Sequence, residues 1–233
     1  MRKIIGYIKY AFLDLLGISY LYDKRKKEII KFLPKNAQII DCGANDGTDS
    51  IKFAKLLPNC TVYAIEPVPD IFHKLVNKTK KFKNIKTFNV AISDQDSTAM
   101  MHVSSGKSDG SSSLLKPKEH LHLNPEVYFF DKIEVKTRKF DTWAVENNIP
   151  SIDCMWLDMQ GYELFALKEA QNLLDNCTCI YTEFSEVENY EEQSNYKELK
   201  DYLIGKGFIL FKEYKDYNFE GDALFIRKNK MKE

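Results

Sequence analysis

Two acidic side chains in the first third of the chain each follow a short apolar run and precede a turn. Asp41 is followed by a turn with glycines at positions 43 and 47, and Glu66 follows the apolar run 61–65. A glycine turn between a strand and a helix presents backbone N–H groups to a nucleotide-like ligand. An acid at the end of the second strand accepts hydrogen bonds from both ribose hydroxyls. The two segments therefore predict a site for a ligand that contains a nucleoside.

The charge of Asp41 separates two classes of ligand. A dinucleotide site has the spacing Gly-x-Gly-x-x-Gly and binds a negative pyrophosphate, whereas this turn lacks the third glycine and carries a carboxylate. Like charges repel, so a cation with an ammonium and a sulfonium, S-adenosylmethionine, fits better. An NAD-dependent oxidoreductase is the alternative hypothesis. The residues predicted to bind the cofactor lie at the strand ends and in the turn: Asp41, Gly43, Ala44, Asn45, Gly47, Thr48, Glu66, Pro67, Ala91, Asp94 and Asp158.

Asp158 and Glu183 follow two further apolar runs, 152–157 and 178–182. The carboxyl ends of parallel strands meet at one edge of a sheet, so both acids are predicted to face the same crevice as the cofactor. One carboxylate could remove the proton of an acceptor hydroxyl while the other positions the acceptor. Alternatively, the two could bind Mg²⁺, or Asp158 could only cap the following helix. We favour the metal-free base and predict no metal ligand, because the neighbouring Gln160 is neutral.

Strand and helix patterns alternate along most of the chain, which predicts one α/β domain. A helix is expected over 24–32, and antiparallel pairing of the last two strands. The predicted strands are 39–41, 61–65, 86–91, 152–157, 178–182, 208–214 and 223–227, with added strands at 100–103 and 133–138.

A polar segment at 104–131 interrupts this alternation. A loop of this length inside a compact domain is usually functional or disordered. We expect it to form part of the acceptor pocket and to spare cofactor binding when shortened. His102, His120 and His122 could be ligands or bases, although scattered surface histidines are commoner.

Composition excludes several classes of protein. Lysine plus arginine equals aspartate plus glutamate, 34 each, so no basic excess is present to bind nucleic acid. The five cysteines include no Cys-x-x-Cys pair and are expected to be core residues. This indicates a reducing compartment and predicts a cytoplasmic location. The oligomeric state stays open.

The first residues of the chain show a helical pattern but neither a signal peptide nor the ~20 apolar residues of a membrane span. This helix is expected to pack on the domain or on a second subunit, and contact with a membrane surface is the alternative. Its apolar face consists of Ile4, Ile5, Ile8, Ala11, Phe12, Leu15 and Leu16.

The chain resembles the FkbM family of S-adenosylmethionine-dependent methyltransferases from about Ile39 to Arg227. The segments similar to the family's motifs, in order, are Asp41–Gly47, Ala64–Pro67, Ser111–Leu114, Lys139–Thr142, Trp156–Glu163 and Tyr181–Glu183. The resemblance implies a class I, Rossmann-like methyltransferase domain over 36–233, with a seven-stranded, mostly parallel sheet whose last strand is antiparallel. A helical extension, 1–35, precedes this domain, and 104–131 is its acceptor-side insertion. The activity implied is O-methylation of a sugar, a glycan or another small hydroxylated metabolite.

Gln160 departs from the pattern, because the family usually has Glu at this position. An amide can position a hydroxyl but cannot take a proton or carry charge to a metal. Any ionic role of that Glu then falls to Asp158, Glu163 or Glu183, which are our candidate catalytic residues. The substitution also keeps open a non-catalytic protein that binds S-adenosylmethionine on the same fold.

Overall fold

The computed structural model describes residues 23–215 and 219–230. Its central feature is a seven-stranded sheet in the order β3-β2-β1-β7-β8-β10-β9. The strands are β1 Gln38–Cys42, β2 Thr61–Ile65, β3 Ile85–Phe88, β7 Cys154–Leu157, β8 Cys179–Ser185, β9 Phe208–Lys215 and β10 Glu220–Arg227. β1, β2, β3, β7 and β8 pair in parallel, and β10 runs antiparallel to both β8 and β9. The predicted fold class, including the antiparallel last strand, is confirmed.

A three-stranded sheet in the order β4-β6-β5 forms a separate layer. It contains β4 Ala91–Ile92, β5 Ser97–Gly106 and β6 Val127–Arg138. The strand predicted at 86–91 is confirmed only as far as Phe88, because the chain leaves one sheet there and enters the other at Ala91. Asn89 lies at this crossing, and its side-chain amide donates to the carbonyls of Glu66 (2.9 Å) and Pro67 (3.0 Å).

Helices cover both faces of the seven-stranded sheet because successive side chains of a strand point to opposite faces. In β1, Ile39 packs with Phe53 and Ile29 on one face, and Ile40 packs with Leu167 and Trp143 on the other. The first face carries α2 Lys24–Ile29, the short helix η2 Ile30–Phe32, α3 Thr48–Leu56 and α4 Pro69–Thr79. The second carries α6 Phe140–Glu146, α7 Glu163–Lys168, α8 Gln171–Asn176 and α9 Tyr196–Gly205. A short helix, η3 Lys228–Lys230, follows β10.

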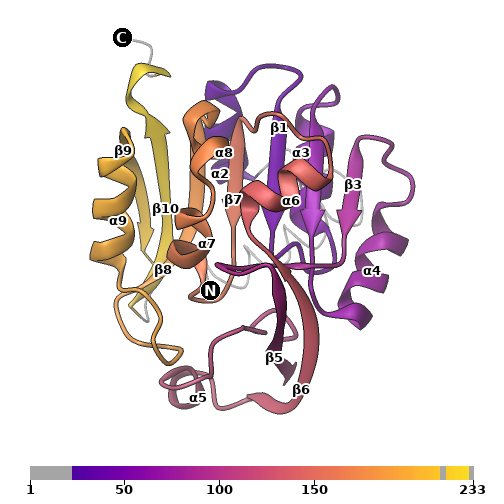
Figure 1. Cartoon of the computed structure of the whole chain (residues 1–233), viewed down its shortest axis with the longest axis vertical. Helices are drawn as coiled ribbons and strands as arrows, with labels where there is room; N and C mark the ends of the chain where they lie inside the picture. Colours follow the sequence, from indigo (N-terminus) through magenta and orange to yellow (C-terminus); the bar gives the residue numbers. More distant parts are fainter. Residues whose placement is uncertain (1–22, 216–218, 231–233) are drawn as a thin grey trace, which may run out of the picture.

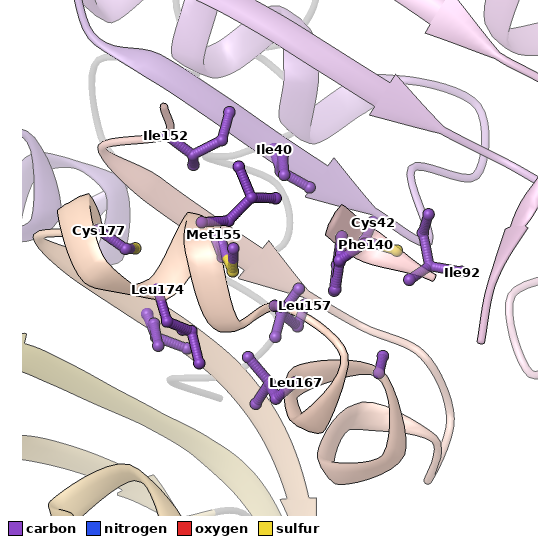
Figure 2. Close-up of a cluster of buried hydrophobic side chains, with 14 of the residues drawn as sticks. Ile40, Cys42, Ile92, Phe140, Ile152, Met155, Leu157, Leu167, Leu174 and Cys177 are labelled. Carbon is purple, nitrogen blue, oxygen red and sulfur yellow. The ribbon is translucent and has the colours of Figure 1, made fainter. Parts of the chain in front are cut away.

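The larger apolar core lies between the second helical layer and the sheet. Figure 2 shows Met155 and Leu157 of β7 among side chains of α6, α7 and α8, with Ile40 from the neighbouring strand. All five cysteines are free and buried, as expected for small core residues. This core fixes the positions of the strand ends, where the candidate site lies.

The hairpin of β5 and β6 extends away from the seven-stranded sheet, and α5 His120–Leu123 lies in the loop that joins its strands (Figure 1). The predicted strands at 100–103 and 133–138 are confirmed and are longer than expected. The predicted N-terminal helix with its apolar face lies outside the described residues, whereas the helix predicted at 24–32 corresponds to α2 and η2. None of the described helices is long and apolar enough to span a membrane.

Truncation of Leu167 tests the importance of this core. Leu167 of α7 is completely buried, so Leu167→Ala should lower the free energy of unfolding by about 2–5 kcal/mol. Val145 of α6 is 77% exposed, so Val145→Ala should change it by less than about 0.5 kcal/mol. Urea unfolding followed by circular dichroism measures both variants. Equal losses of stability would contradict the packing described.

Candidate active site

The turn after β1 lies directly against the end of β7. Gly43 has a φ of +82°, and a Cβ atom there would lie 1.8 Å from the carbonyl oxygen of Asp158. The N–H of Asp158 donates to the carbonyl of Cys42 (3.0 Å), and the N–H groups of Gly43 and Ala44 donate to the carbonyl of Ile65 (3.0 and 2.9 Å). Only glycine fits at position 43, because it tolerates both the left-handed backbone and the close approach.

Glu66 lies at the end of β2, next to this turn, and is 5% exposed. Its two carboxylate oxygens accept hydrogen bonds from the backbone N–H groups of Asn45 (3.0 Å) and Val68 (2.8 Å). Burial raises the pKa of Glu66 to about 7, although both hydrogen bonds oppose this effect. Each carboxylate oxygen has a second lone pair, so the group can still accept hydrogen bonds from a ligand.

A small cavity, here called the turn cavity, adjoins Gly43 and Glu66. Its polar wall includes Asn45, Asp109 and Asp158. Its apolar wall consists of side chains from β4, β5 and the neighbouring turns: Val90, Ala91, Ile92, Met101, Leu114 and Met159. The free space is about 50 Å³, far less than a nucleoside occupies. The insertion contributes Asp109, Gly110, Ser112 and Leu114 to the wall of this cavity.

Some of the residues predicted to bind the cofactor line the turn cavity, and others support its walls. Those that line it are Gly43, Asn45, Glu66, Pro67, Ala91 and Asp158. Ala44 packs against Leu75 instead, and Gly47 is the N-cap residue of α3. The hydroxyl of Thr48 donates to Asp46 (2.6 Å), and Asp94 accepts a hydrogen bond from Tyr162 (2.8 Å).

Asp41 does not line the turn cavity, in contrast to the expectation from the sequence. Its side chain is 1% exposed and accepts a hydrogen bond from the Ser50 hydroxyl of α3 (2.5 Å). The alternation of side chains along β1 explains this position, because Asp41 points to the same face as Ile39. Burial raises the pKa of Asp41 to about 7, and the nearby Asp49 adds to this effect. The carboxyl joins β1 to α3 inside the protein.

Asp158 and Glu183, both predicted to end strands, are brought together by Gln160. Asp158 follows β7 as expected, whereas Glu183 lies within β8 because that strand continues to Ser185. The side-chain amide of Gln160 donates to Asp158 (2.7 Å) and to Glu183 (2.7 Å). Its carbonyl oxygen accepts a hydrogen bond from the Tyr190 hydroxyl (2.8 Å). The backbone of Gln160 is left-handed, with a φ of +53°, and the Ser113 hydroxyl donates to its carbonyl (2.8 Å). The short loop between β7 and α7 is therefore held from three sides.

Asp158 and Glu183 also contact each other, and each affects the pKa of the other. Burial raises the pKa of Asp158 to about 6. Burial, followed by the negative charge of Asp158, raises the pKa of Glu183 well above its usual range. Two like charges this close do not both ionise readily, so the pair holds on to one proton more strongly than either acid would alone.

Glu163, the third candidate catalytic acid, is the first residue of α7 and is 4% exposed. Its carboxylate accepts a hydrogen bond from the N–H of Met159 (2.8 Å), which ties the loop to the helix. Burial raises the pKa of Glu163 to about 7. Within residues 23–215 and 219–230, no three His, Cys, Asp or Glu side chains are arranged to hold a metal ion.

A second and larger cavity, here called the polar cavity, opens on the other side of Asp158. It has a volume of about 540 Å³ and is lined by Asp158, Gln160, Glu163 and Glu183. The segment 104–131 lines both cavities, so its role is broader than the expected acceptor side alone. Sequence reasoning missed several residues of the polar cavity, whose positions depend on pairing between distant loops: Asn189, Tyr190, Gln193, Tyr196 and Glu220.

Comparisons with known proteins identify the family. Residues 41–217 match the methyltransferase FkbM domain. A curated relative, the 2-O-methyltransferase NoeI of Sinorhizobium fredii (strain NBRC 101917 / NGR234), is 33% identical over 214 residues, covering 89% of this chain and 86% of the relative. This chain belongs to the FkbM methyltransferase family. It is an S-adenosylmethionine-dependent methyltransferase, and the NAD-dependent alternative is wrong.

Solved structures show the same fold at low sequence identity. Aeropyrum pernix fibrillarin in complex with natively bound S-adenosyl-L-methionine matches with a TM-score of 0.51 and 12% identity, covering 83% of this chain and 69% of that chain. A putative rRNA-methylase from Clostridium thermocellum matches with a TM-score of 0.51 and 11% identity, covering 88% and 94%. The Rossmann-like architecture of this FkbM methyltransferase is thus shared with distant enzymes.

The turn cavity has a donor and acceptor set that suits S-adenosylmethionine. Glu66 offers carboxylate oxygens to ribose hydroxyls, and the apolar wall around Ala91 and Ile92 suits a flat base. The Asp158 carboxylate offers a negative charge to a cationic ligand. These residues would hold the cofactor.

Removal of the Glu66 carboxylate should weaken cofactor binding. Glu66→Ala is expected to lower the affinity for S-adenosylhomocysteine by roughly 1.5–3 kcal/mol, because the ribose hydroxyls of the ligand lose their hydrogen bonds to the carboxylate. Isothermal titration calorimetry measures the affinity, and Glu66→Gln, which keeps one acceptor oxygen, is the matched control. An unchanged affinity in Glu66→Ala would remove this residue from the cofactor site.

The buried Asp41 should make the stability of this FkbM methyltransferase depend on pH. Folded Asp41 keeps its proton up to about pH 7, whereas the unfolded carboxyl loses it near 3.8. The folded state binds the extra proton in this window, so the Asp41 contribution to the free energy of unfolding decreases as pH rises through it.

Asp41→Asn stays neutral and keeps an oxygen for the Ser50 hydroxyl, so it should show a smaller decrease than the wild type between about pH 4 and pH 7. Urea unfolding at several pH values measures the slope. The exposed Asp201→Asn on α9 is the control and should keep the slope of the wild type. Identical slopes for Asp41→Asn and the wild type would contradict the buried carboxyl.

Proposed function

We propose that this chain transfers a methyl group from S-adenosylmethionine to a hydroxyl oxygen of a sugar, a glycan or another small hydroxylated metabolite. The observation that carries this proposal is the position of Asp158, which lines both the turn cavity and the polar cavity. The name of the relative NoeI, a 2-O-methyltransferase, supports transfer to oxygen. The polar lining of the larger cavity supports a hydroxylated acceptor.

Asp158 has the charge and the position of a general base. A hydroxyl is a poor nucleophile while it is protonated, and a base whose pKa lies near the working pH accepts the proton efficiently. The pKa of Asp158, raised by burial to about 6, leaves it mostly ionised at neutral pH. S-adenosylmethionine, when bound, supplies the electrophilic methyl group.

Glu183 and Gln160 position this base. When it carries a proton, Glu183 can donate to Asp158 or to the acceptor oxygen, and the Gln160 amide holds both carboxyl groups in place (2.7 Å each). Glu163 fixes the loop through Met159 and lies at the wall of the polar cavity. Alignment of the acceptor oxygen with the methyl carbon is the other contribution that such a rigid site makes.

The charge balance and the cysteines support the class of acceptor and the cellular compartment that we propose. Equal numbers of acidic and basic residues, 34 each, support a small-molecule or glycan acceptor rather than a nucleic acid. The five free, buried cysteines support a reducing compartment such as the cytoplasm.

Replacement of Asp158 tests the proposed base. With saturating cofactor, Asp158→Asn should lower kcat by about 10²–10⁴-fold on any acceptor that the wild type methylates. Methyl transfer from labelled S-adenosylmethionine to a panel of sugars and glycans measures the rate. The exposed Asp201→Asn is the matched control and should keep the wild-type rate.

Three other results would revise the proposal. Near wild-type turnover by Asp158→Asn would exclude Asp158 as the base. Inhibition of the wild type by EDTA would favour a metal-bound carboxylate pair instead. Tight binding of S-adenosylhomocysteine without methyl transfer to any acceptor would favour a non-catalytic binding protein.

A further inference from the structure

We propose that Tyr190 is a positioning residue for methyl transfer: its hydroxyl anchors the side-chain amide of Gln160, which in turn holds the proposed base, Asp158. This inference rests on the proposed function and concerns a residue, in the loop between β8 and α9, that no sequence motif identified. Tyr190 is 2% exposed and lines the polar cavity. Its hydroxyl bonds to the amide rather than to an acid, so it acts on the base through that amide.

The two ends of the Gln160 amide have different partners. Its Nε2 lies 2.7 Å from an oxygen of Asp158 and 2.7 Å from an oxygen of Glu183, so both of its protons are used. Its Oε1, which only accepts hydrogen bonds, lies 2.8 Å from the Tyr190 hydroxyl. Without that hydroxyl, the amide loses its anchor at this end and is free to turn into the polar cavity, where water competes with the acids for its protons.

Tyr190 suits the role of an anchor because its own position is fixed. Its backbone N–H donates to Oε1 of Gln193 (2.9 Å). Its ring contacts those of His120 and Phe129 at centroid distances of 5.5 and 6.4 Å. A ring that is already held in this way loses little further freedom when its hydroxyl bonds to Gln160, so the bond is formed at a small cost in entropy. Burial also raises the pKa of Tyr190, so the phenol keeps the proton that it donates.

The hydrogen bond from the amide matters because Asp158 lies in acidic surroundings. Burial raises the pKa of Asp158 to about 6, and the hydrogen bonds from Gln160 and Glu183 oppose this effect. Asp222 of β10 and Asp49 of α3 add to the effect of burial. Asp158 also repels acids on several other elements: Glu163 of α7, Glu183 of β8, Glu66 after β2 and Asp41 of β1. Loss of the Gln160 hydrogen bond should therefore raise the pKa of Asp158 further.

Tyr190→Phe tests this inference, because it keeps the ring and removes only the hydroxyl. The pKa of Asp158, read from the pH dependence of its carboxyl carbon signal in nuclear magnetic resonance, should rise by roughly 0.5–1 pH unit as the Gln160 hydrogen bond weakens. Asp158→Asn assigns the signal. The acidic limb of the pH profile of kcat/KM should move to higher pH by the same amount, which lowers kcat/KM below that limb roughly 3- to 10-fold.

Gln160→Met identifies the route of the effect, because it keeps the length of the side chain but cannot donate to the acids. This variant should raise the pKa of Asp158 at least as far as Tyr190→Phe does. Adding Tyr190→Phe to Gln160→Met should then change neither the pKa nor the pH profile further, since two residues that act through one contact are not additive. Tyr202→Phe is the matched control and should keep both wild-type values, because the Tyr202 hydroxyl donates to the carbonyl of Leu167 (3.0 Å).

An unchanged pKa of Asp158 in Tyr190→Phe or in Gln160→Met would overturn this inference. A full further shift in the double variant would also overturn it, because the hydroxyl would then act through the carbonyl of Ser111, which lies 2.9 Å from it. Affinity for S-adenosylhomocysteine verifies the fold of each variant, and Gln160→Met can still refute the inference if Tyr190→Phe does not fold. The carboxyl signal needs no acceptor. Absence of turnover by the wild type therefore overturns the proposed function, whereas the link from Tyr190 to Asp158 is judged separately.

Discussion

The contact between Gly43 and the backbone of Asp158 determines the arrangement of the whole site. No side chain fits between the turn after β1 and the end of β7, because a Cβ atom on Gly43 would lie 1.8 Å from the carbonyl oxygen of Asp158. The pairing of β1 with β7, extended by the hydrogen bond between Asp158 and Cys42, fixes this distance. The residues proposed to bind the cofactor and to accept the proton therefore lie at the ends of neighbouring strands, and the apolar core below them keeps the strands in register.

Charge balance at the end of β7 depends on an amide. Gln160 donates to Asp158 and to Glu183, so it stabilises the one negative charge that the two acids share. A glutamate at position 160 would add a third carboxyl group to an already acidic wall and would raise the repulsion there. The hydrogen bond from the amide lowers the pKa of Asp158 and so opposes the effect of burial.

The sequence was sufficient for the presence and approximate position of the strands, because apolar runs separated by helical patterns predict alternating strands and helices. It also predicted that Glu66 and Asp158 follow the ends of two strands, whereas Glu183 was expected to end a strand that continues to Ser185. Asp41 was expected in the cofactor crevice. Side chains alternate along β1, however, and that of Asp41 points towards α3 instead. The backbone contact between His120 and Asn189 could not be predicted from the sequence, since a contact between two loops depends on long-range packing that no local pattern encodes.

The two loops that enclose the polar cavity are joined by their backbones. The N–H of Lys118 donates to the carbonyl of Asn189 (2.8 Å), and the N–H of Glu191 donates to the carbonyl of Lys116 (2.7 Å). A change of shape in one loop therefore displaces the other. During evolution or in enzyme engineering, exchanging only the insertion between two such enzymes would separate it from its matching loop. Transfer of acceptor preference requires grafting both segments together.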